Sequence, residues 1–167
     1  MRNSKFLAAA AVAVPALALS QPAMAGSNSG DMAVSALVLD NCTVVAGPLN
    51  FGSITDLGSS DVNAQSTITL ACTPNAGFQV GLDDGDNANA GQRRLTNTAN
   101  GEFIAYEVYS DGGYSTRWGN TLDTDTVSGT ANAAGVASLT AYGQIASGVN
   151  SVSAGLYTDT ITVTVNF

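Results

Sequence analysis

The chain has 167 residues, of which 45% are hydrophobic and only 11% are charged. Thirteen acidic residues outnumber five basic ones, so the net charge at neutral pH is −8. Binding to nucleic acid or anionic lipid depends on many Lys and Arg contacts with phosphate, and this composition therefore disfavours both partners. The sequence has no histidine, which removes the imidazole base that commonly activates serine and cysteine nucleophiles.

The first 25 residues have the organisation of a secretory signal peptide. Arg2 and Lys5 precede an apolar run, and Ala23-Met24-Ala25 matches the small-residue cleavage pattern. We expect cleavage after Ala25, because the apolar run is shorter than the roughly 20 residues that span a bilayer. The mature chain then has three arginines, no lysine, a net charge near −10 and the length of one domain. We expect no membrane insertion after cleavage, since no later stretch is long and apolar enough.

Cys42 and Cys72 are the two cysteines of the sequence. In an exported protein they should form one disulfide bond. A zinc site or a reactive thiol is the alternative, but no histidine and no third cysteine are present to complete either. Closing a loop of about 30 residues contributes roughly 3–4 kcal/mol to stability through the unfolded state.

Alternating apolar and polar residues, separated by glycine-rich turns, predict strands and almost no helix in the mature chain. The expected strands lie at residues 32–39, 42–46, 65–72, 77–82, 102–110, 135–145 and 156–167. Between Gly119 and Gly135 the pattern is too loose to place a strand boundary. Several short strands in a domain of this size predict an all-β sandwich.

The C-terminal strand has the clearest alternation. Its apolar phase carries Tyr157, Ile161, Val163, Val165 and Phe167, and its other phase carries threonines and Asn166. One face should therefore be buried and the other hydrated. Chain termini normally fray, so a chain that ends in its strongest strand predicts that something covers this strand.

The segment that follows the signal is largely apolar on both phases. One phase carries Met32, Val34, Ala36 and Val38. The other phase carries Ala33, Ser35, Leu37 and Leu39. Two apolar faces do not suit a solvent-exposed edge strand. Periodicity alone leaves two interpretations open: a built-in first strand, and a strand that inserts into another molecule.

The sequence offers little catalytic chemistry, and we expect no enzyme, no metal site and no cofactor. Without histidine or mature lysine there is no Ser-His or Ser-Lys pair, and no G-x-S-x-G or G-x-x-x-x-G-K motif occurs. Paired carboxylates could serve a glycosidase in principle, but acids on sandwich strands and turns are normally hydrated. The polar loop at residues 83–91 resembles a calcium loop only superficially, because Ala88 and Leu95 occupy ligand positions. We expect a solvated turn there.

Aromatic residues near the middle of the chain leave a second alternative open. Trp118, Tyr114 and Tyr109 could line a sugar site, as aromatic side chains do in binding domains. For Trp118, a lone tryptophan near a turn, packing in the core or between sheets is the stronger interpretation. Asn41-Cys42-Thr43 also matches a glycosylation pattern, which we attribute to chance because Cys42 is needed for the disulfide.

An ordered set of segments resembles the spore coat protein U domain family, which includes the major subunits of Csu-type archaic chaperone-usher pili. Each segment is weak by itself, but together they cover nearly all of the mature chain in the family's order. The segments are the alternation ending in Asn41-Cys42-Thr43, Leu49-Asn50-Phe51-Gly52, Ile68-Thr69-Leu70-Ala71-Cys72, Arg94-Leu95-Thr96-Asn97-Thr98, Ile104-Ala105-Tyr106-Glu107-Val108-Tyr109-Ser110-Asp111, Tyr142-Gly143-Gln144-Ile145 and Ala154-Gly155-Leu156-Tyr157-Thr158-Asp159 with the strand up to Phe167.

This resemblance implies an incomplete Ig-like β-sandwich that lacks its last strand, with an apolar groove beside the strand that ends at Phe167. In that family a periplasmic chaperone fills the groove first. The N-terminal segment of the next subunit then replaces the chaperone at an outer-membrane usher. Such strand addition takes affinity from backbone hydrogen bonds and specificity from alternate side chains. The implied domains are a signal peptide (1–25), a donor-strand segment (26–40) and a pilin sandwich (41–167).

The resemblance also implies roles for the N-terminal segment with two apolar faces and for the C-terminal strand. The acceptor groove would be lined by Tyr157, Ile161, Val163, Val165 and Phe167. By register with Cys42, the inserted donor face would be Met32, Val34, Ala36 and Val38. A slip of one residue would present the other phase instead.

The expected function is a structural subunit of a homopolymeric pilus on the surface of a Gram-negative bacterium. The assembled fibre would support adhesion and biofilm formation. The alternatives are a tip or accessory adhesin, and a self-contained secreted coat protein whose own first strand closes its sheet.

Overall fold

The computed structural model describes residues 26–149 and 151–167, so the expected signal peptide lies outside the described residues. The chain divides into an N-terminal unit that ends at Ala36 and a globular unit, Leu37–Phe167. In the N-terminal unit, residues 26–36 form no strand or helix and are exposed. Across the described ranges, no helix is long and apolar enough to cross a bilayer.

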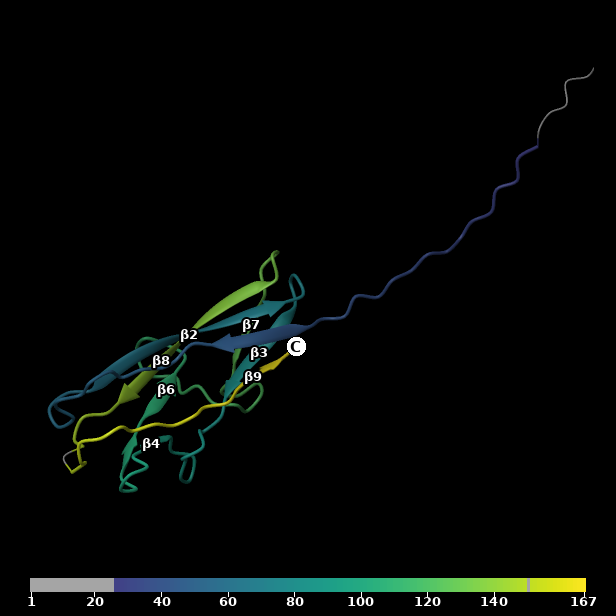
Figure 1. Cartoon of the computed structure of the whole chain (residues 1–167). Helices are drawn as coiled ribbons and strands as arrows, with labels where there is room; N and C mark the ends of the chain where they lie inside the picture. The colour runs from purple at the N-terminus through teal and green to yellow at the C-terminus, as the bar shows by residue number, and fades with distance from the viewer. Residues whose placement is uncertain (1–25, 150) are drawn as a thin grey trace, which may run out of the picture. The chain divides into compact units, whose positions relative to one another are not determined.

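The strands described in the globular unit all pair antiparallel, and residues 37–149 and 151–167 contain no helix (Figure 1). Their bounds are β1 (Cys42–Ala46), β2 (Val62–Cys72), β3 (Gly77–Leu82), β4 (Arg94–Thr96), β5 (Phe103–Ala105), β6 (Glu107–Tyr109), β7 (Val127–Thr130), β8 (Val136–Ile145) and β9 (Val163–Asn166). One sheet has the order β1-β2-β8-β6 and a second has the order β7-β3-β9. The strands β4 and β5 form a small third sheet. The predicted all-β class is confirmed.

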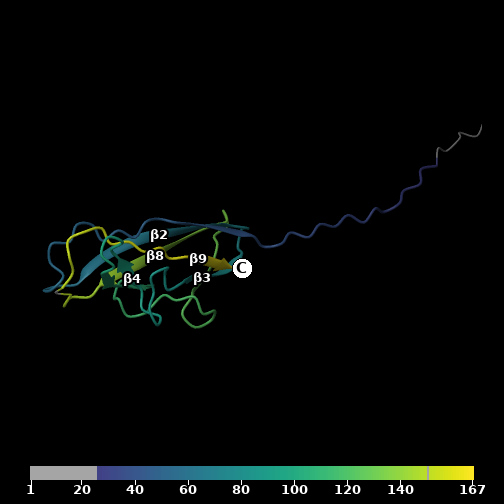
Figure 2. The same ribbon diagram turned by 60° about the horizontal axis from the view of Figure 1, so that its bottom comes forward.

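The core lies between the two larger sheets, which Figure 2 shows with β2 and β8 on one side and β3 on the other. Leu70, Val108 and Ile145 point inward from the four-stranded sheet and are almost fully buried. Phe78 and Val80 face them from β3. The strict alternation of burial along β2 explains why its pattern was readable from the sequence.

Trp118 belongs to this core. Its side chain is 1% exposed, and its indole nitrogen donates a hydrogen bond to the carbonyl oxygen of Val80 at 2.8 Å. A buried indole needs such a partner for its N–H group. The interpretation of Trp118 as a core residue is confirmed, and it does not line a sugar site.

The predicted disulfide joins Cys42 and Cys72. The two residues are direct partners at one end of the β1–β2 ladder. The bond therefore fixes β1 to the long strand β2. It secures a strand at the edge of its sheet, since β2 is the only described strand that pairs with β1.

Three expected strands differ from the observed ones by more than a shift of one end. Residues 32–39 form no strand, because a strand needs a neighbouring edge to satisfy its backbone groups and none of the described strands pairs with this segment. The expected strand 102–110 is split at Tyr106, whose backbone nitrogen bonds to the carbonyl of Arg93 at 3.1 Å. The chain thus leaves the sheet with β4 and joins β8. Of residues 156–167, only Val163–Asn166 is a strand.

Two short strands were not predicted. The strand β4 (Arg94–Thr96) has only three residues, too few to show an alternation. The strand β7 (Val127–Thr130) lies in the loosely patterned region and contributes only one partly buried side chain, Val127.

Candidate functional site

Two strand edges without a partner flank an opening between the sheets. On one side β1 is hydrogen-bonded to β2, and on the other side β9 is hydrogen-bonded to β3. No strand among the described residues pairs with the second edge of either. The two strands approach each other and lie side by side in Figure 1. Unpaired edges present rows of free N–H and C=O groups that can accept a further strand.

An apolar cavity of about 490 Å³ lies between these two edges. Its lining comes from the end of β1 and the loop after it, from the inner face of the sandwich, and from the chain before and within β9. The apolar lining residues include Ala46, Leu49, Phe51, Ile68, Leu82, Leu95, Val108, Ala141, Ile161 and Val163. A second cavity of about 1120 Å³ adjoins it and shares Leu49, Phe51 and Leu95. We call the two together the groove.

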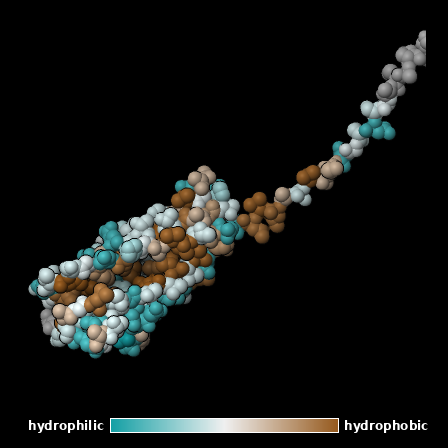
Figure 3. Space-filling view, in the orientation of Figure 1, coloured by the Kyte–Doolittle hydropathy of each residue, from teal (hydrophilic) through white to brown (hydrophobic). Residues whose placement is uncertain are grey.

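The hydropathy of the surface agrees with this description. Figure 3 shows hydrophobic residues gathered in an elongated band on the face where β1 and β9 lie in Figure 1. Hydrophilic residues border the band. Large continuous apolar surfaces are uncommon on monomeric proteins and mark interaction sites.

The residues expected from the C-terminal pattern lie in different parts of this region. Ile161 and Val163 line the first cavity, and Tyr157 lines the second. Val165 packs against the core beyond the cavities. Phe167 is 55% exposed at the chain end. Ile161, Val163 and Val165 are only half-buried, so the core is not closed on this side.

The floor of the groove contains a carboxylate that the apolar pattern did not single out. Asp159 accepts a hydrogen bond from the Tyr106 hydroxyl at 2.7 Å, and from the backbone and side-chain nitrogens of Asn87 at 3.0 and 2.9 Å. Burial, and next the bond to Asp159, raise the pKa of Tyr106 above its ordinary value. A charged residue on the inward phase between Tyr157 and Ile161 was the available signal in the sequence.

Residues 156–162 form no strand, and much of their backbone pairs with a loop. The loop after β3, at residues 83–92, runs along them in place of a strand. Asp83 and Thr162 exchange two backbone and side-chain hydrogen bonds, and the backbone nitrogen of Asp86 bonds to the carbonyl of Thr160. We expect a solvated turn in this loop, but the side chains of Asp83, Asp84 and Asn87 bond to other parts of the protein, while Asp86 is exposed. The described residues contain no cluster of three or more metal-ligating side chains.

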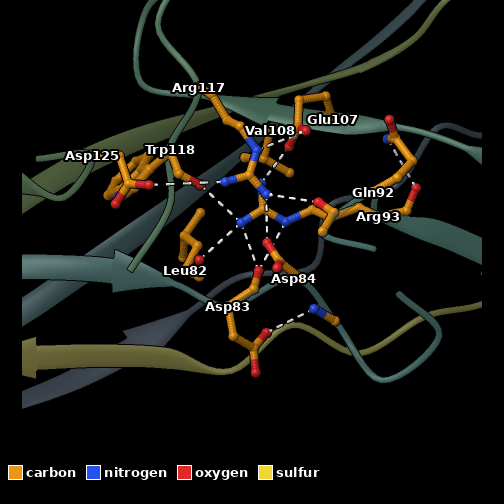
Figure 4. A network of polar contacts seen from close by, with 12 residues as sticks. Leu82, Asp83, Asp84, Gln92, Arg93, Glu107, Val108, Arg117, Trp118 and Asp125 are labelled. Carbon is orange, nitrogen blue, oxygen red and sulfur yellow. Dashed lines mark hydrogen bonds and ion pairs between the residues drawn. The ribbon is translucent and has the colours of Figure 1, made fainter. Parts of the chain in front are cut away.

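A buried arginine holds the wall of the groove (Figure 4). Arg93 is 0% exposed and donates to the carbonyl oxygens of Leu82, Asp83 and Trp118 at 2.6–2.9 Å. Its remaining nitrogen forms an ion pair with Glu107. Leu82 on β3 and Val108 on β6, which follows Glu107 directly, both line the groove. The network around Arg93 therefore fixes the spacing of β3 and β6 at the groove.

A second arginine extends the network toward the surface. Arg117 pairs with Glu107 at 2.9 Å and also with Asp84. Arg94, the neighbour of Arg93, instead bonds to the carbonyl of Asn87 and stacks over the ring of Phe103 at 4.5 Å. Each of the three arginines among the described residues is therefore engaged with the protein.

The far end of the groove depends on an ionised carboxylate. Glu102 accepts hydrogen bonds from the backbone and hydroxyl of Ser153 and from the hydroxyl of the groove residue Tyr157. These bonds, first that from the Ser153 backbone, lower the pKa of Glu102 from its ordinary value of 4.5. The pKa of Glu102 is lower in the folded than in the unfolded state, so ionised Glu102 stabilises the fold fully above pH 4.5. This stabilisation is lost as the pH falls through the folded-state pKa.

We therefore expect the urea midpoint of unfolding to fall between about pH 6 and pH 3, and to fall less in Glu102→Gln. At the lower pH the variant and the unmodified chain should unfold at similar urea concentrations. The pKa values of Asp56, Asp61 and Asp111 are also lowered by hydrogen bonds. These residues should preserve part of the slope of the urea midpoint against pH in the variant. An equal slope in both proteins would contradict the role given to Glu102.

The second feature of interest is the segment before β1. Met32 is 86% exposed and Val34 is 85% exposed, and Ala36 is also exposed. Within the globular unit, Leu37, Val38 and Leu39 are more than two-thirds exposed. Exposing so many apolar side chains in sequence is costly in water and is typical of surfaces that bind a partner.

Comparison with known proteins gives two findings. The family model of the spore coat protein U domain matches residues 28–164. A solved structure, the complex of the CsuC chaperone with the CsuE tip adhesion subunit from archaic chaperone-usher Csu pili of Acinetobacter baumannii, contains a chain similar to this one. The identity is 27%, the TM-score is 0.58, and the match covers 78% of this chain and 40% of that chain. A search of curated proteins gave no match.

The structural match is consistent with an Ig-like sandwich, which is the fold class expected from the sequence. This chain spans less than half of the length of the chain that it matches.

Proposed function

Because the chain belongs to the spore coat protein U domain family, we propose that it is a structural subunit of a surface pilus assembled by strand exchange between subunits. One observation carries the proposal. The sandwich has an apolar cavity between two unpaired edges, and the same chain has an exposed segment with alternating apolar side chains. A strand from a neighbouring subunit would satisfy both edges and cover the half-buried residues of β9.

The proposed donor face is Met32, Val34, Ala36 and Val38, and the proposed acceptor residues are Tyr157, Ile161, Val163, Val165 and Phe167. Burying the larger donor side chains is worth about 1.5–3 kcal/mol each. Backbone hydrogen bonds on both sides of the inserted strand add about 1 kcal/mol each. Dissociation would require the whole strand to leave at once, which makes a kinetically stable fibre.

Before assembly the open groove needs a temporary occupant, because a sandwich with an exposed core edge aggregates. A periplasmic chaperone fits this need, and the similar solved chain comes from a chaperone–subunit complex. An outer-membrane usher would then pass the subunit to a homopolymer at the surface of a Gram-negative cell. There the fibre would serve adhesion and biofilm formation.

The proposal is tested by two matched variants of the mature chain, residues 26–167. Ile161→Asp places a charge in the groove and leaves the N-terminal segment intact. Val34→Asp places a charge on the donor face and leaves the groove intact. Each variant alone should remain monomeric in size-exclusion chromatography with light scattering, because each lacks one half of the joint. An equimolar mixture should form a dimer, since one variant donates and the other accepts.

Thr162→Asp and Ser35→Asp are the control variants. Each places the charge one residue after the tested position, on the opposite face of the strand. Both control variants should still polymerise. Circular dichroism checks that all four variants are folded. Polymers from either single charge variant, or a mixture that stays monomeric, would contradict strand exchange. A mature chain that is a stable monomer would favour the coat-protein alternative, in which residues 32–38 close their own sheet.

A further inference from the structure

Three of the five tyrosines form a cluster away from the groove. Tyr109 on β6 and Tyr142 on β8 are direct cross-strand partners. Tyr114, from the loop after β6, packs against both rings edge to face, with centroid distances of 5.8 Å to Tyr109 and 6.4 Å to Tyr142. Such pairs hold aromatic rings in a fixed mutual geometry. We call these three residues the tyrosine cluster.

The cluster lies on the outer face of the four-stranded sheet. Val108 and Ala141, the sequence neighbours of Tyr109 and Tyr142, are buried and line the groove. Successive side chains of a strand point to opposite faces, so Tyr109 and Tyr142 point away from the groove. A strand inserted in the groove would leave this face open.

The hydroxyl groups separate the cluster from the other two tyrosines. The hydroxyl of Tyr106 donates to Asp159, and that of Tyr157 bonds to Glu102 and Ser153. Among the described residues, the hydroxyls of the tyrosine cluster have no hydrogen-bond partner. Every buried side-chain oxygen among the described residues has a hydrogen-bond partner. These three hydroxyls, which have none, are therefore accessible to solvent. Three rings are thus fixed by packing while their polar tips remain free for a ligand.

The loop that carries Tyr114 is held in a strained, ordered conformation. Tyr114 has a φ of 54°, which is rare for a bulky side chain. The carboxylate of Asp111 accepts hydrogen bonds from the backbone nitrogens of Gly113, Ser115 and Thr116. The bond from Thr116 first, and then those from Ser115, lower the pKa of Asp111. Backbone strain that the surroundings impose is found preferentially at binding and active sites.

The surroundings of the cluster indicate the class of ligand. On the same outer face, the neighbouring positions of β2 and β8 carry neutral amides, Asn63, Gln65 and Gln144. Amide groups both donate and accept hydrogen bonds, as sugar hydroxyls require. The nearby charges are mainly acidic, since the carboxylates of Glu107, Asp111 and Asp61 are close enough to interact electrostatically with Tyr109. The nearby Arg117 is already paired with Glu107 and Asp84. Anionic ligands are therefore disfavoured.

We propose that Tyr109, Tyr114 and Tyr142 form a binding site for a glycan chain without acidic groups. Flat aromatic rings contact the C–H faces of pyranose rings, and the free phenol hydroxyls with the amides bind sugar hydroxyls. The site is independent of the pilus proposal, because it belongs to the outer face of one subunit. In a fibre it would recur on each subunit, and weak single sites would gain avidity.

The test uses isothermal titration calorimetry on the mature chain, with cellohexaose, N-acetylglucosamine hexamer and glucosamine hexamer as probes. At least one probe should bind, and Tyr142→Ala and Tyr114→Gly should each weaken binding about tenfold or more, since each removes an aromatic contact. Glycine suits the positive φ of Tyr114, so that loss would report the ring and not the backbone. Tyr142→Phe, which keeps the ring, should bind more strongly than Tyr142→Ala.

Phe103→Ala is the matched control, because Phe103 is a 52% exposed aromatic on β5 outside the cluster. This variant should bind the probe as the unmodified chain does. A hyaluronan oligomer, which carries carboxylates, should not bind. The proposal is overturned if none of the three probes binds at millimolar concentration, or if binding survives the loss of Tyr142 and Tyr114. Loss of self-association without any glycan binding would instead assign the cluster to subunit contacts. The oligomeric state of the same variants reports on strand exchange separately.

Discussion

Fusing residues 26–39 behind Phe167 through a flexible linker should raise the Tm of the core, residues 40–167, by about 10–20 °C. The strand β9 ends at Asn166, so a linked segment can turn and run back antiparallel into the groove between β9 and β1. The expected gain of several kcal/mol comes from covering Ile161 and Val163 and from pairing two free strand edges. Differential scanning calorimetry of the core with and without the fused segment measures it.

Two variants of the fused segment separate its two faces. Replacing Met32, Val34 and Val38 by serine should abolish most of the gain in Tm. Replacing Leu37 and Leu39 by serine, on the other phase, should preserve most of it. The reverse result would show that the strand inserts with a register shifted by one residue. Equal Tm values with and without the segment would mean that the sandwich is complete by itself.

The sequence could predict those parts of the fold in which neighbouring residues carry the signal. The strands at Cys42–Ala46 and Gly77–Leu82 have the predicted bounds, and the disulfide joins the predicted cysteines. A period of two is visible wherever one face of a strand is buried against the core. The strand β2 was found for the same reason, although it begins three residues earlier than expected.

The parts that could not be predicted depend on contacts between distant segments. Nothing near Tyr106 shows that its hydroxyl meets Asp159, which is 53 residues away, or that the chain changes sheets there. Likewise, residues 156–162 bond to the distant loop at residues 83–92 and, through Thr158, to Thr96 of β4. The apolar phase of the last strand is visible in the sequence, but Leu49 and Phe51 in the groove come from a segment that forms no strand.

The adjacent residues Arg93 and Arg94 illustrate the same limit. The sequence Arg93-Arg94 gives no reason to bury one arginine and leave the other partly exposed. The structure does so because successive side chains point to opposite sides at the start of β4. Arg93 enters the network between β3, β6 and Trp118, while Arg94 lies over Phe103. The two neighbours therefore form a matched pair for a stability experiment.

Arg93→Met should lower the free energy of unfolding by about 3–5 kcal/mol, because the change leaves the carbonyls of Leu82, Asp83 and Trp118 without their donor. Arg94→Met removes one backbone hydrogen bond and one cation–π contact, and it should cost about 1 kcal/mol. Arg93→Lys keeps the charge but not the planar fork that reaches several acceptors, so its loss should lie between the two.

Urea unfolding of the disulfide-bonded core measures all three variants. Similar losses for Arg93→Met and Arg94→Met would contradict the role of Arg93 as the centre of the network. If the role is correct, Arg93→Met should also weaken strand insertion in the fused protein, so that its gain in Tm shrinks. That coupling is expected because Leu82 and Val108, which the network positions, line the groove that the inserted strand must fill.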